Sequence, residues 1–404
     1  MSDFDRDALA ARLSTFSLSD LEQPVGEALE LFDRARSKCP VPHSDRQGGF
    51  FMLLNDEDVR SAMMNWQVFS SAPSALRPLA ERPEDQFRTP PLDYDPPEQA
   101  AWRQFYTRVI NANSAAAVKE KLKPELNAIF DRMFERGKGD LVTELANVIP
   151  AAAIFLLLGI DDPKGREFVL YHHRVMNAAS HDHEKFAAHR KEICNFAWNE
   201  AQKRRENPQD DALTELAHMK LDGQLLTEKE LGTLVGTMLS AGSGTTGVAL
   251  ASLFHDVLSR PDLRAQLIAE MSLIPAAINE SLRLHTPFFG LFRRVTKEVT
   301  VQGQTLPENT SVLMCWQAAN LDPKAFDDPR EFRLNRPGSH LTFGLGTHFC
   351  AGARLARAEL EVALELLLTR YPDIELANDK PIEPRFIGAG AAGIPSLPVV
   401  FPRR

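Results

Sequence analysis

The stretch FGLGTHFCAG, Phe343 to Gly352, decides how the chain is interpreted, because it places one thiol, Cys350, among glycines. Apolar residues recur at helical spacing beyond it, so a buried helix is predicted to begin at about Gly352. A helix N-terminus stabilises an anionic sulfur through its dipole and its free N–H groups. Gly344, Gly346 and Gly352 lack side chains and let a flat ligand approach closely. On this motif alone, a buried structural cysteine and a redox-active or nucleophilic thiol remain open.

Composition narrows the class of protein. The chain has 404 residues, of which 44% are hydrophobic and 25% charged, as in ordinary soluble globular enzymes. No linker, charge block or repeat divides it, which favours one domain over residues 1–404. The net charge of −9 argues against a nucleic-acid partner and gives no basic anchor for a membrane. With no signal-peptide pattern and four widely spaced cysteines, we expect neither disulfides nor a zinc site, and a cytoplasmic location.

One apolar segment, Leu231 to Phe254, spans 24 residues without a charge. Its five glycines, four threonines and three serines make it too polar for a good membrane span. Thr227 and Glu230 form a capping-box pattern just before it, and Pro261 marks its end. We therefore predict a long helix buried through the middle of the protein. Each central glycine costs about 0.5–1 kcal/mol of helix stability, which suggests that something flat or reactive lies against this helix.

The flanking segments give a mainly helical pattern. Asp95 is a candidate N-cap for a helix that follows two prolines. Glu280 and Arg283 lie three residues apart on a short helix, so both side chains share one face and can form an ion pair. Residues 293–316 alternate and are rich in β-branched residues, which predicts short strands and turns. The predicted fold class is therefore mainly α with a minor β region late in the chain.

Together these motifs resemble one family, the cytochrome P-450 haem-thiolate monooxygenases. FGLGTHFCAG matches the family's cysteine-ligand loop at every specified position, and ESLR, residues 280–283, matches its Glu-x-x-Arg helix. AGSGTT at 241–246 is similar to most of the oxygen-binding helix. DPPEQAAWR at 95–103 is similar to the haem-flanking helix, and residues 319–336 look like the meander before the cysteine loop. The matches follow the family's order from about residue 50 to 400, and they favour its soluble bacterial camphor-hydroxylase-like branch.

The resemblance implies a single-domain cytochrome P-450 fold, with haem b between the long central helix and the cysteine-loop helix. Cys350 is the implied axial thiolate, whose electron donation to the iron favours O–O cleavage. Glu280, Arg283 and Arg336 are the implied structural network behind the haem. Gln99 stands where many relatives have histidine, so an amide hydrogen bond is expected there. The implied cofactor-binding residues are Arg103, Gln99, Arg293, His348, Gly344, Gly346 and Gly352.

The implied reaction inserts one oxygen atom from O2 into a small apolar substrate; a terpenoid or aromatic compound is expected first, a fatty acid second. No flavin or nicotinamide motif is present, so a ferredoxin or flavodoxin is expected to deliver electrons near Cys350, where Arg103, Arg354 and Arg357 could form a basic patch. A peroxide-driven peroxygenase and a non-catalytic haem sensor are the alternatives. The predicted substrate pocket includes Phe288, Phe289, Leu291, Thr237 and Ala241.

One position departs from the family's pattern. Relatives usually place an aspartate or glutamate just before the conserved threonine, whereas this chain has Gly244 before Thr245. Glycine cannot carry a proton, but its missing side chain leaves space for an ordered water beside Thr245. Thr245 and Gly244 are therefore the predicted catalytic positions. We expect Ser243, Thr246 or a polar group on the substrate to hold that water.

Overall fold

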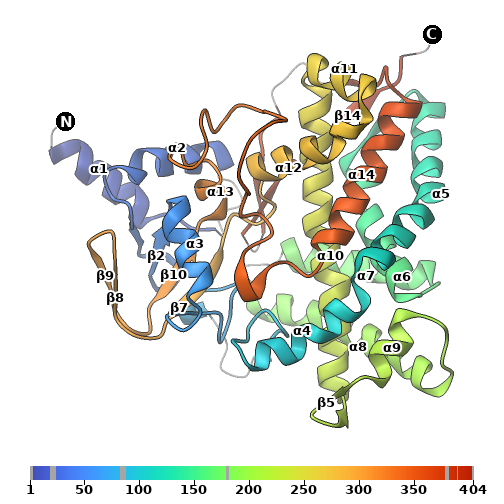
Figure 1. Cartoon of the computed structure of the whole chain (residues 1–404), viewed down its shortest axis with the longest axis horizontal. Coiled ribbons are helices and arrows are strands. Elements are labelled where there is room, and N and C mark those ends of the chain that lie inside the picture. Colours follow the sequence, from blue (N-terminus) through green and yellow to red (C-terminus); the bar gives the residue numbers. More distant parts are fainter. Residues whose placement is uncertain are drawn as a thin grey trace.

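The computed structural model describes residues 3–18, 24–81, 88–178, 182–377, 382–388 and 390–402. Figure 1 shows most helices on one side of the molecule, and the N-terminal helices with the main sheet on the other. The α-helices are α1 (Asp3–Ser14), α2 (Val25–Arg36), α3 (Asp56–Met64), α4 (Glu98–Val109), α5 (Ala112–Arg136), α6 (Ile149–Leu158), α7 (Pro163–Ala178), α8 (His183–Glu206), α9 (Ala212–His218), α10 (Glu228–Leu258), α11 (Pro261–Ala269), α12 (Ile274–Leu284), α13 (Trp316–Ala319) and α14 (Ala353–Arg370).

The strands are short and occupy a small part of the chain. They are β1 (His43–Ser44), β2 (Phe50–Leu53), β3 (Phe69–Ser70), β4 (Lys138–Asp140), β5 (Lys220–Leu221), β6 (Gln224–Leu225), β7 (Leu291–Val295), β8 (Val299–Val301), β9 (Gln304–Leu306), β10 (Ser311–Met314), β11 (Glu375–Leu376), β12 (Arg385–Gly388), β13 (Ala391–Gly393) and β14 (Pro398–Val400). The predicted fold class, mainly α with a minor β region, is confirmed.

Helix α10 runs through the middle of the molecule (Figure 1). Thr227 and Glu230 form the predicted capping box, in which each side chain accepts a hydrogen bond from the other residue's backbone N–H. Within the described residues, α10 is the one helix long and apolar enough to span a membrane, yet 67% of its most apolar window is buried. It packs against α6, α8, α12 and α14. The prediction of a buried central helix is therefore confirmed.

Two glycines let α10 approach α8 closely. A Cβ added to Gly232 would lie 2.9 Å from the carbonyl oxygen of Cys194, and one added to Gly236 would lie 3.0 Å from Cys194 Sγ. Gly232 also faces Trp198, which is one turn later in α8. Because the later residue of α8 meets the earlier residue of α10, the two helices run antiparallel. The N-terminal part of α8 therefore lies beside the middle of α10.

The glycines at the centre of α10 also serve helix packing. A Cβ on Gly242 would lie 2.6 Å from Ile154 Cδ1 of α6, and one on Gly247 would lie 2.5 Å from the carbonyl oxygen of Ala146. Both distances are far below van der Waals contact, so a larger residue would push the neighbouring segments away. Helix packing accounts for these two glycines, and the expectation that something flat or reactive lies against α10 stays a prediction. At these positions the missing side chains make room for Ile154 and for the Ala146 carbonyl group.

The main sheet has the strand order β1-β2-β10-β7-β3. Strand β10 pairs in parallel with β2 and antiparallel with β7, and β7 pairs antiparallel with β3. Strands β7 to β10 confirm the strands and turns predicted for residues 293–316. The register pairs Val312 with Arg293, which places this arginine in a central strand.

A buried ion-pair network joins α12 to the segment that precedes the Cys350 loop. Arg283 donates to both carboxylate oxygens of Glu280 at 2.8 Å, and Arg336 Nε donates to Glu280 Oε1 at 2.8 Å. Arg283 also donates to the carbonyl oxygens of Asn320 and Pro329, at 2.8 and 2.7 Å. Burial by itself raises the pKa of the Glu280 carboxyl, but the hydrogen bonds from the two arginines outweigh burial, so the pKa is lowered. The three predicted network residues are thus in contact.

Asp95 does not cap α4, contrary to the sequence prediction. Helix α4 begins at Glu98, and Pro97 occupies the N-cap position without a side-chain hydrogen bond. The Asp95 carboxylate accepts hydrogen bonds from the Ser70 hydroxyl and the Ser71 amide instead. This contact joins the segment before α4 to the end of β3. A local sequence pattern does not reveal such a distant partner.

Replacing Glu280 with alanine leaves the Arg283 guanidinium buried without its carboxylate. We expect Glu280→Ala to lower the free energy of unfolding by about 3–5 kcal/mol, measured by urea denaturation at neutral pH. Arg333→Ala is the matched control, because its side chain pairs with Asp328 and Glu331 at the surface. That control should leave the urea midpoint close to that of the parent, because exposed ion pairs contribute little to stability. A Glu280→Ala protein as stable as the parent would show that the network does not stabilise the fold.

Candidate functional site

The Cys350 loop is a tight turn that leads directly into α14. Gly344 and Gly346 have φ angles of 70° and 64°, in the left-handed region that side chains rarely adopt. The Cys350 amide donates to the carbonyl oxygen of Phe343 at 2.7 Å and closes the loop. Gly352 then occupies the N-cap position of α14, so the predicted helix start is confirmed. The thiol lies immediately before a helix N-terminus.

Cys350 differs from the other cysteines in its surroundings. Its side chain is exposed, although the surrounding protein desolvates the thiol. Burial raises the pKa of this thiol, while neighbouring amide groups and the charges of Arg103 and Arg357 act in the opposite direction. Cys315, by contrast, is fully buried, and burial raises the pKa of its thiol strongly. Cys350 is therefore the cysteine that a ligand can reach.

Arg293 carries a buried charge beside this loop. It is 4% exposed, and Nη1 donates to the carbonyl oxygen of Phe292 at 2.8 Å. Within the described part of the chain, no carboxylate lies within ion-pair distance of its guanidinium. Burial lowers the pKa of Arg293 to about 10, and the more distant Asp95 and Asp93 only partly oppose this effect. A buried arginine without a close counter-ion is costly, so its surroundings favour an anionic ligand.

Three further donors converge on the same end of the loop. Gln99 Nε2 donates to the carbonyl oxygen of Thr347 at 2.7 Å, and Arg103 Nη1 donates to the same oxygen at 3.3 Å. His348 Nε2 lies 3.0 Å from Ser71 Oγ. Burial lowers the pKa of His348 to about 3, and the charges of Arg293 and Arg103 lower it further, so the imidazole is neutral at pH 7.

A stripe of open positions lies on α10. Ala241 is exposed in the middle of this buried helix, and Thr237, Gly244 and Thr245 are only partly buried. Positions three and four residues apart lie on one helical face, so these four residues form a single stripe. The Thr245 hydroxyl donates to the carbonyl oxygen of Ala241 at 3.0 Å. The stripe is small and mostly apolar, with one hydroxyl at each end.

Two of the residues expected to support Thr245 lie off this stripe. Ser243 and Thr246 are 6% and 5% exposed, and the Ser243 hydroxyl donates to the carbonyl oxygen of Leu239 at 2.6 Å. A helix advances about 100° per residue, so residues one or two positions away from the stripe point elsewhere. The expectation that Ser243 or Thr246 holds a water beside Thr245 is therefore not supported.

The aromatic residues predicted for the substrate pocket occupy different places. Phe289 is fully buried and packs against Phe16, Phe32 and Phe386, with ring centroids 5.2–6.1 Å apart. It belongs to the core beneath the N-terminal helices, so its assignment to the pocket is wrong. Leu291 is also buried, in the cluster around the main sheet. Phe288 remains partly exposed.

Two residues near the site were not predicted from the sequence. Ser71 contacts His348 although 277 residues separate them. Arg190 on α8 donates to the Thr89 hydroxyl at 2.8 Å and lies near the middle of α10. Neither residue belongs to a motif, and only the antiparallel packing of α8 on α10 brings Arg190 to this region. No local signal in the sequence could have found either one.

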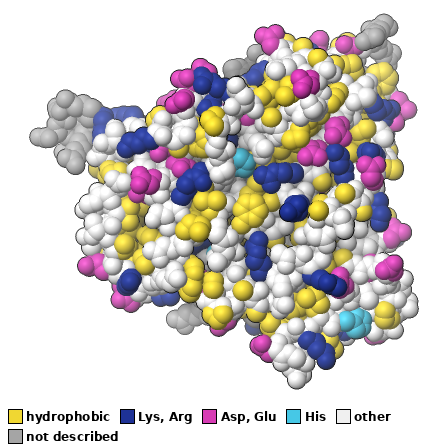
Figure 2. Space-filling view, viewed as in Figure 1, with side chains coloured by type: hydrophobic (Ala, Val, Ile, Leu, Met, Phe, Trp, Pro, Cys, Tyr) yellow, Lys and Arg dark blue, Asp and Glu magenta, His cyan; other side chains and the backbone are white. Residues whose placement is uncertain are grey.

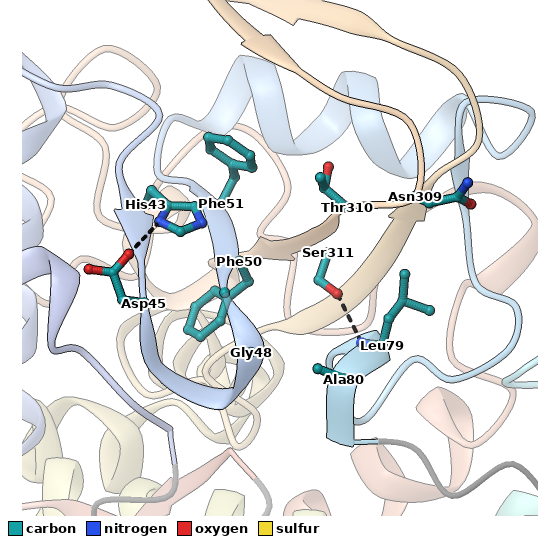
Figure 3. Close-up of a pocket in the computed structure, with 11 residues that line it drawn as sticks. His43, Asp45, Gly48, Phe50, Phe51, Leu79, Ala80, Asn309, Thr310 and Ser311 are labelled. Atoms are coloured by element: carbon teal, nitrogen blue, oxygen red, sulfur yellow. Dashed lines mark hydrogen bonds and ion pairs between the residues drawn. The ribbon is translucent and has the colours of Figure 1, made fainter.

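A separate surface pocket lies between the hairpin of β1 and β2 and the start of β10 (Figure 3). His43 Nδ1 faces Asp45 at 3.1 Å, and Ser311 Oγ accepts a hydrogen bond from the Leu79 amide at 2.9 Å. No thiol and no arginine is found among the described residues that line it. It therefore lacks the groups that make the Cys350 region suitable for a cofactor.

The Cys350 region fits the haem that the sequence resemblance implies. Iron needs an anionic or neutral soft ligand that it can reach, and Cys350 provides an accessible thiol. The haem propionates need cations and N–H donors, and Arg293, Arg103, Gln99 and His348 lie near one another; within the described residues no ion pair is formed by either arginine. Thr347 Oγ1 is buried without a partner in the described structure, which leaves one further polar group for a ligand.

Comparisons with known proteins agree with this geometry. The family model described as Cytochrome P450 matches residues 165–400. A steroid C26-monooxygenase of Mycolicibacterium smegmatis is 30% identical over 383 residues, 93% of each chain. Mycinamicin IV hydroxylase/epoxidase of Micromonospora griseorubida is 31% identical over 81% of this chain and 83% of its own. The ligand-free structure of cytochrome P450 TbtJ1 superposes with a TM-score of 0.82 at 29% identity, covering 95% of this chain and 99% of that one. The chain therefore belongs to the cytochrome P450 family, whose members bind haem through a cysteine thiolate and act as monooxygenases.

Proposed function

We propose that in this monooxygenase Cys350 is the iron ligand and that one oxygen atom from O2 enters a small apolar organic substrate. The accessible Cys350 thiol, placed immediately before the α14 N-terminus, is the observation that carries the proposal. The open stripe around Ala241 on α10 is the surface proposed to face the substrate. When bound, haem supplies the activation of O2 with two electrons and two protons, and the second oxygen atom leaves as water.

The donor cluster would hold and orient the cofactor. Arg293 and Arg103 would bind the propionates through charge-assisted hydrogen bonds, and Gln99 and His348 would contribute N–H groups. The propionates would then provide the negative charge that buried Arg293 lacks. Gly352 leaves the surroundings of the Cys350 sulfur open, Gly344 and Gly346 supply the left-handed turns of the loop, and the amides around Cys350 would stabilise its thiolate.

Thr245 governs proton delivery on the substrate side. Because its hydroxyl proton is bound to the Ala241 carbonyl, its oxygen lone pairs are free to accept a hydrogen bond on the open stripe. Gly244 beside it leaves room for a water molecule. That water, held by Thr245 and by a polar group of the substrate, replaces the missing carboxylate as the proton carrier.

Electrons arrive from a ferredoxin or flavodoxin on the outer face of the Cys350 loop. Figure 2 shows lysine and arginine side chains around apolar patches on the face that carries α4 and the start of α14. A surface pocket here is lined by Phe343, Phe349, Arg357 and Asn279, and Phe349 is 40% exposed. A peroxygenase would form product with hydrogen peroxide alone, and a haem sensor would form none.

The substrate proposed from the sequence is a terpenoid or aromatic compound. Two related proteins are named for action on a steroid and on mycinamicin IV. The stripe of Thr237, Ala241 and Gly244 on α10 is compatible with an apolar body of this kind. The protein is proposed to be cytoplasmic and to belong to the soluble bacterial camphor-hydroxylase-like branch.

Replacing Cys350 tests the iron ligand. Cys350→Ala should lose the strongly red-shifted Soret band of the reduced carbon monoxide complex, because that band requires thiolate ligation, and should lose most product formation. Cys315→Ala is the matched control. The Cys315 thiol is buried, so its removal should leave the band in place. If the Cys350→Ala protein keeps the red-shifted band of the parent, Cys350 is not the iron ligand.

Replacing Thr245 tests the proton route. We expect Thr245→Ala to keep consuming reduced cofactor while forming less product and more hydrogen peroxide, because protons no longer reach the correct oxygen. The measurement is product and peroxide per reduced cofactor consumed. Ser243→Ala is the control on the same helix, because its hydroxyl is bound to Leu239 away from the stripe. If Thr245→Ala matches the parent in both ratios, protons travel by another route.

A further inference from the structure

Helix α8 turns one polar residue toward the interior. Phe186, Arg190 and Cys194 recur every four residues and therefore share one face of α8. Phe186 is 9% exposed, and Cys194 packs against Gly236 of α10. Arg190 lies between them on this inward face and is partly buried. A cation on the packed face of a helix requires a reason other than solubility.

The register between α8 and α10 places Arg190 close to the open stripe. Trp198 lies at the level of Gly232, and Cys194 lies at the level of Gly236. One more turn along the antiparallel pair brings Arg190 to the level of Ser240, next to Ala241. Ala241 is the exposed residue in the middle of α10, so Arg190 stands at the side of the space proposed for the substrate.

Arg190 is poorly satisfied by the protein. Its Nη2 donates to Thr89 Oγ1 at 2.8 Å. Among the described residues no other hydrogen bond from Arg190 is present, and no carboxylate lies within ion-pair distance, although a guanidinium carries five N–H donors. The charge of Arg190 acts on Asp93, but the Asp93 carboxylate already accepts from the amides of Ala75 and Thr89. Most donors of Arg190 thus remain for a ligand.

A second arginine makes this corner more positive. The Arg77 guanidinium lies 4.7 Å from the centre of the Phe186 ring, one turn before Arg190. Burial lowers the pKa of Arg77, Glu81 raises it, and the charge of Arg190 lowers it, so the two cations are close enough to repel. Two arginines that are held together against their repulsion form a typical receptor for an anion.

We propose that the substrate carries a carboxylate, which Arg190 binds at the side of the cavity while the apolar body lies along Ala241 of α10. This inference rests on the proposed monooxygenase function and names its substrate class as an amphipathic carboxylic acid. It refines the expectation of a purely apolar substrate. Arg190 fixes which carbon atom reaches the reacting oxygen, because a bound carboxylate sets the depth and orientation of the chain behind it.

The alternative role for Arg190 is structural. Its hydrogen bond to Thr89 joins α8 to the segment before α4, and this contact could serve only to hold the two elements together. The two roles make different demands on Thr89. A structural contact requires both Arg190 and Thr89, whereas binding of a carboxylate requires only the Arg190 guanidinium.

The test compares carboxylic acids with their methyl esters on the haem-loaded protein. The pairs are built on four skeletons: a fatty acid, an aromatic acid, a terpenoid acid and a steroid acid. Dissociation constants are measured by the spin-state change and, independently of the spectrum, by equilibrium dialysis. We expect at least one acid to bind about tenfold or more tightly than its ester. Arg190→Gln should reduce that ratio to about one, and Arg190→Lys should keep part of it.

Two control variants separate the explanations. Lys191→Gln removes a positive charge from the exposed side of the same helix and should leave the ratio unchanged. Thr89→Val removes the hydroxyl that accepts from Arg190 and should also preserve the preference for the acid. If Arg190 has only a structural role, Thr89→Val should behave like Arg190→Gln. The inference is overturned if no acid binds more tightly than its ester, or if Thr89→Val or Lys191→Gln abolishes the preference as Arg190→Gln does. If the parent protein shows the thiolate Soret band but no preference for an acid over its ester, only this inference is rejected. If the parent protein lacks that band, the proposed function is rejected.

Discussion

The buried pair of Glu280 and Arg283 is the interaction on which the position of the Cys350 loop depends. Arg283 donates to the carbonyl oxygen of Asn320, and the side chain of Asn320 accepts from the Leu341 amide at 2.7 Å and donates to Thr342 Oγ1 at 3.0 Å. The Thr342 hydroxyl in turn donates to the carbonyl oxygen of Leu282, back on α12. The loop that carries the thiol is therefore attached to the ion pair by a closed set of hydrogen bonds, so a change at the pair moves the thiol.

The second constraint is an excess of positive charge beside that loop. Arg293 is buried in a central strand, and Arg103 lies close enough to affect His348 and Cys350. Such a cluster opposes folding until an anion neutralises it, because the two guanidinium groups lose water and gain carbonyl partners but, among the described residues, no ion-pair partner. Cofactor binding and stability are consequently linked: a ligand that binds only the folded state stabilises that state by mass action. The same residues that orient the cofactor thus make the folded protein depend on it.

The parts of the structure that sequence reasoning predicted are those with short-range causes. The α10 capping box, the start of α14 after Gly352 and the contact of Glu280 with Arg283 all follow from spacings of a few residues. The errors concern distant partners. Phe289 follows α12 closely in the sequence, yet its ring enters an aromatic cluster with Phe16, Phe32 and Phe386. Arg190 reaches the site only through the packing of α8 on α10, which no spacing within α8 encodes.

The absence of a carboxylate at position 244 changes what the substrate must do. On the α10 stripe the protein provides one hydroxyl beside the reacting space, that of Thr245, because Ser243 and Thr246 point away from it. A water in the space left by Gly244 needs two or more polar partners to be ordered, and Thr245 is only one. A carboxylate substrate held by Arg190 is anchored one turn away, near Ser240, so its acid group cannot also stand beside Thr245. The second partner of the water must then be another polar atom of the substrate, which links the regiochemistry of binding to the efficiency of proton delivery.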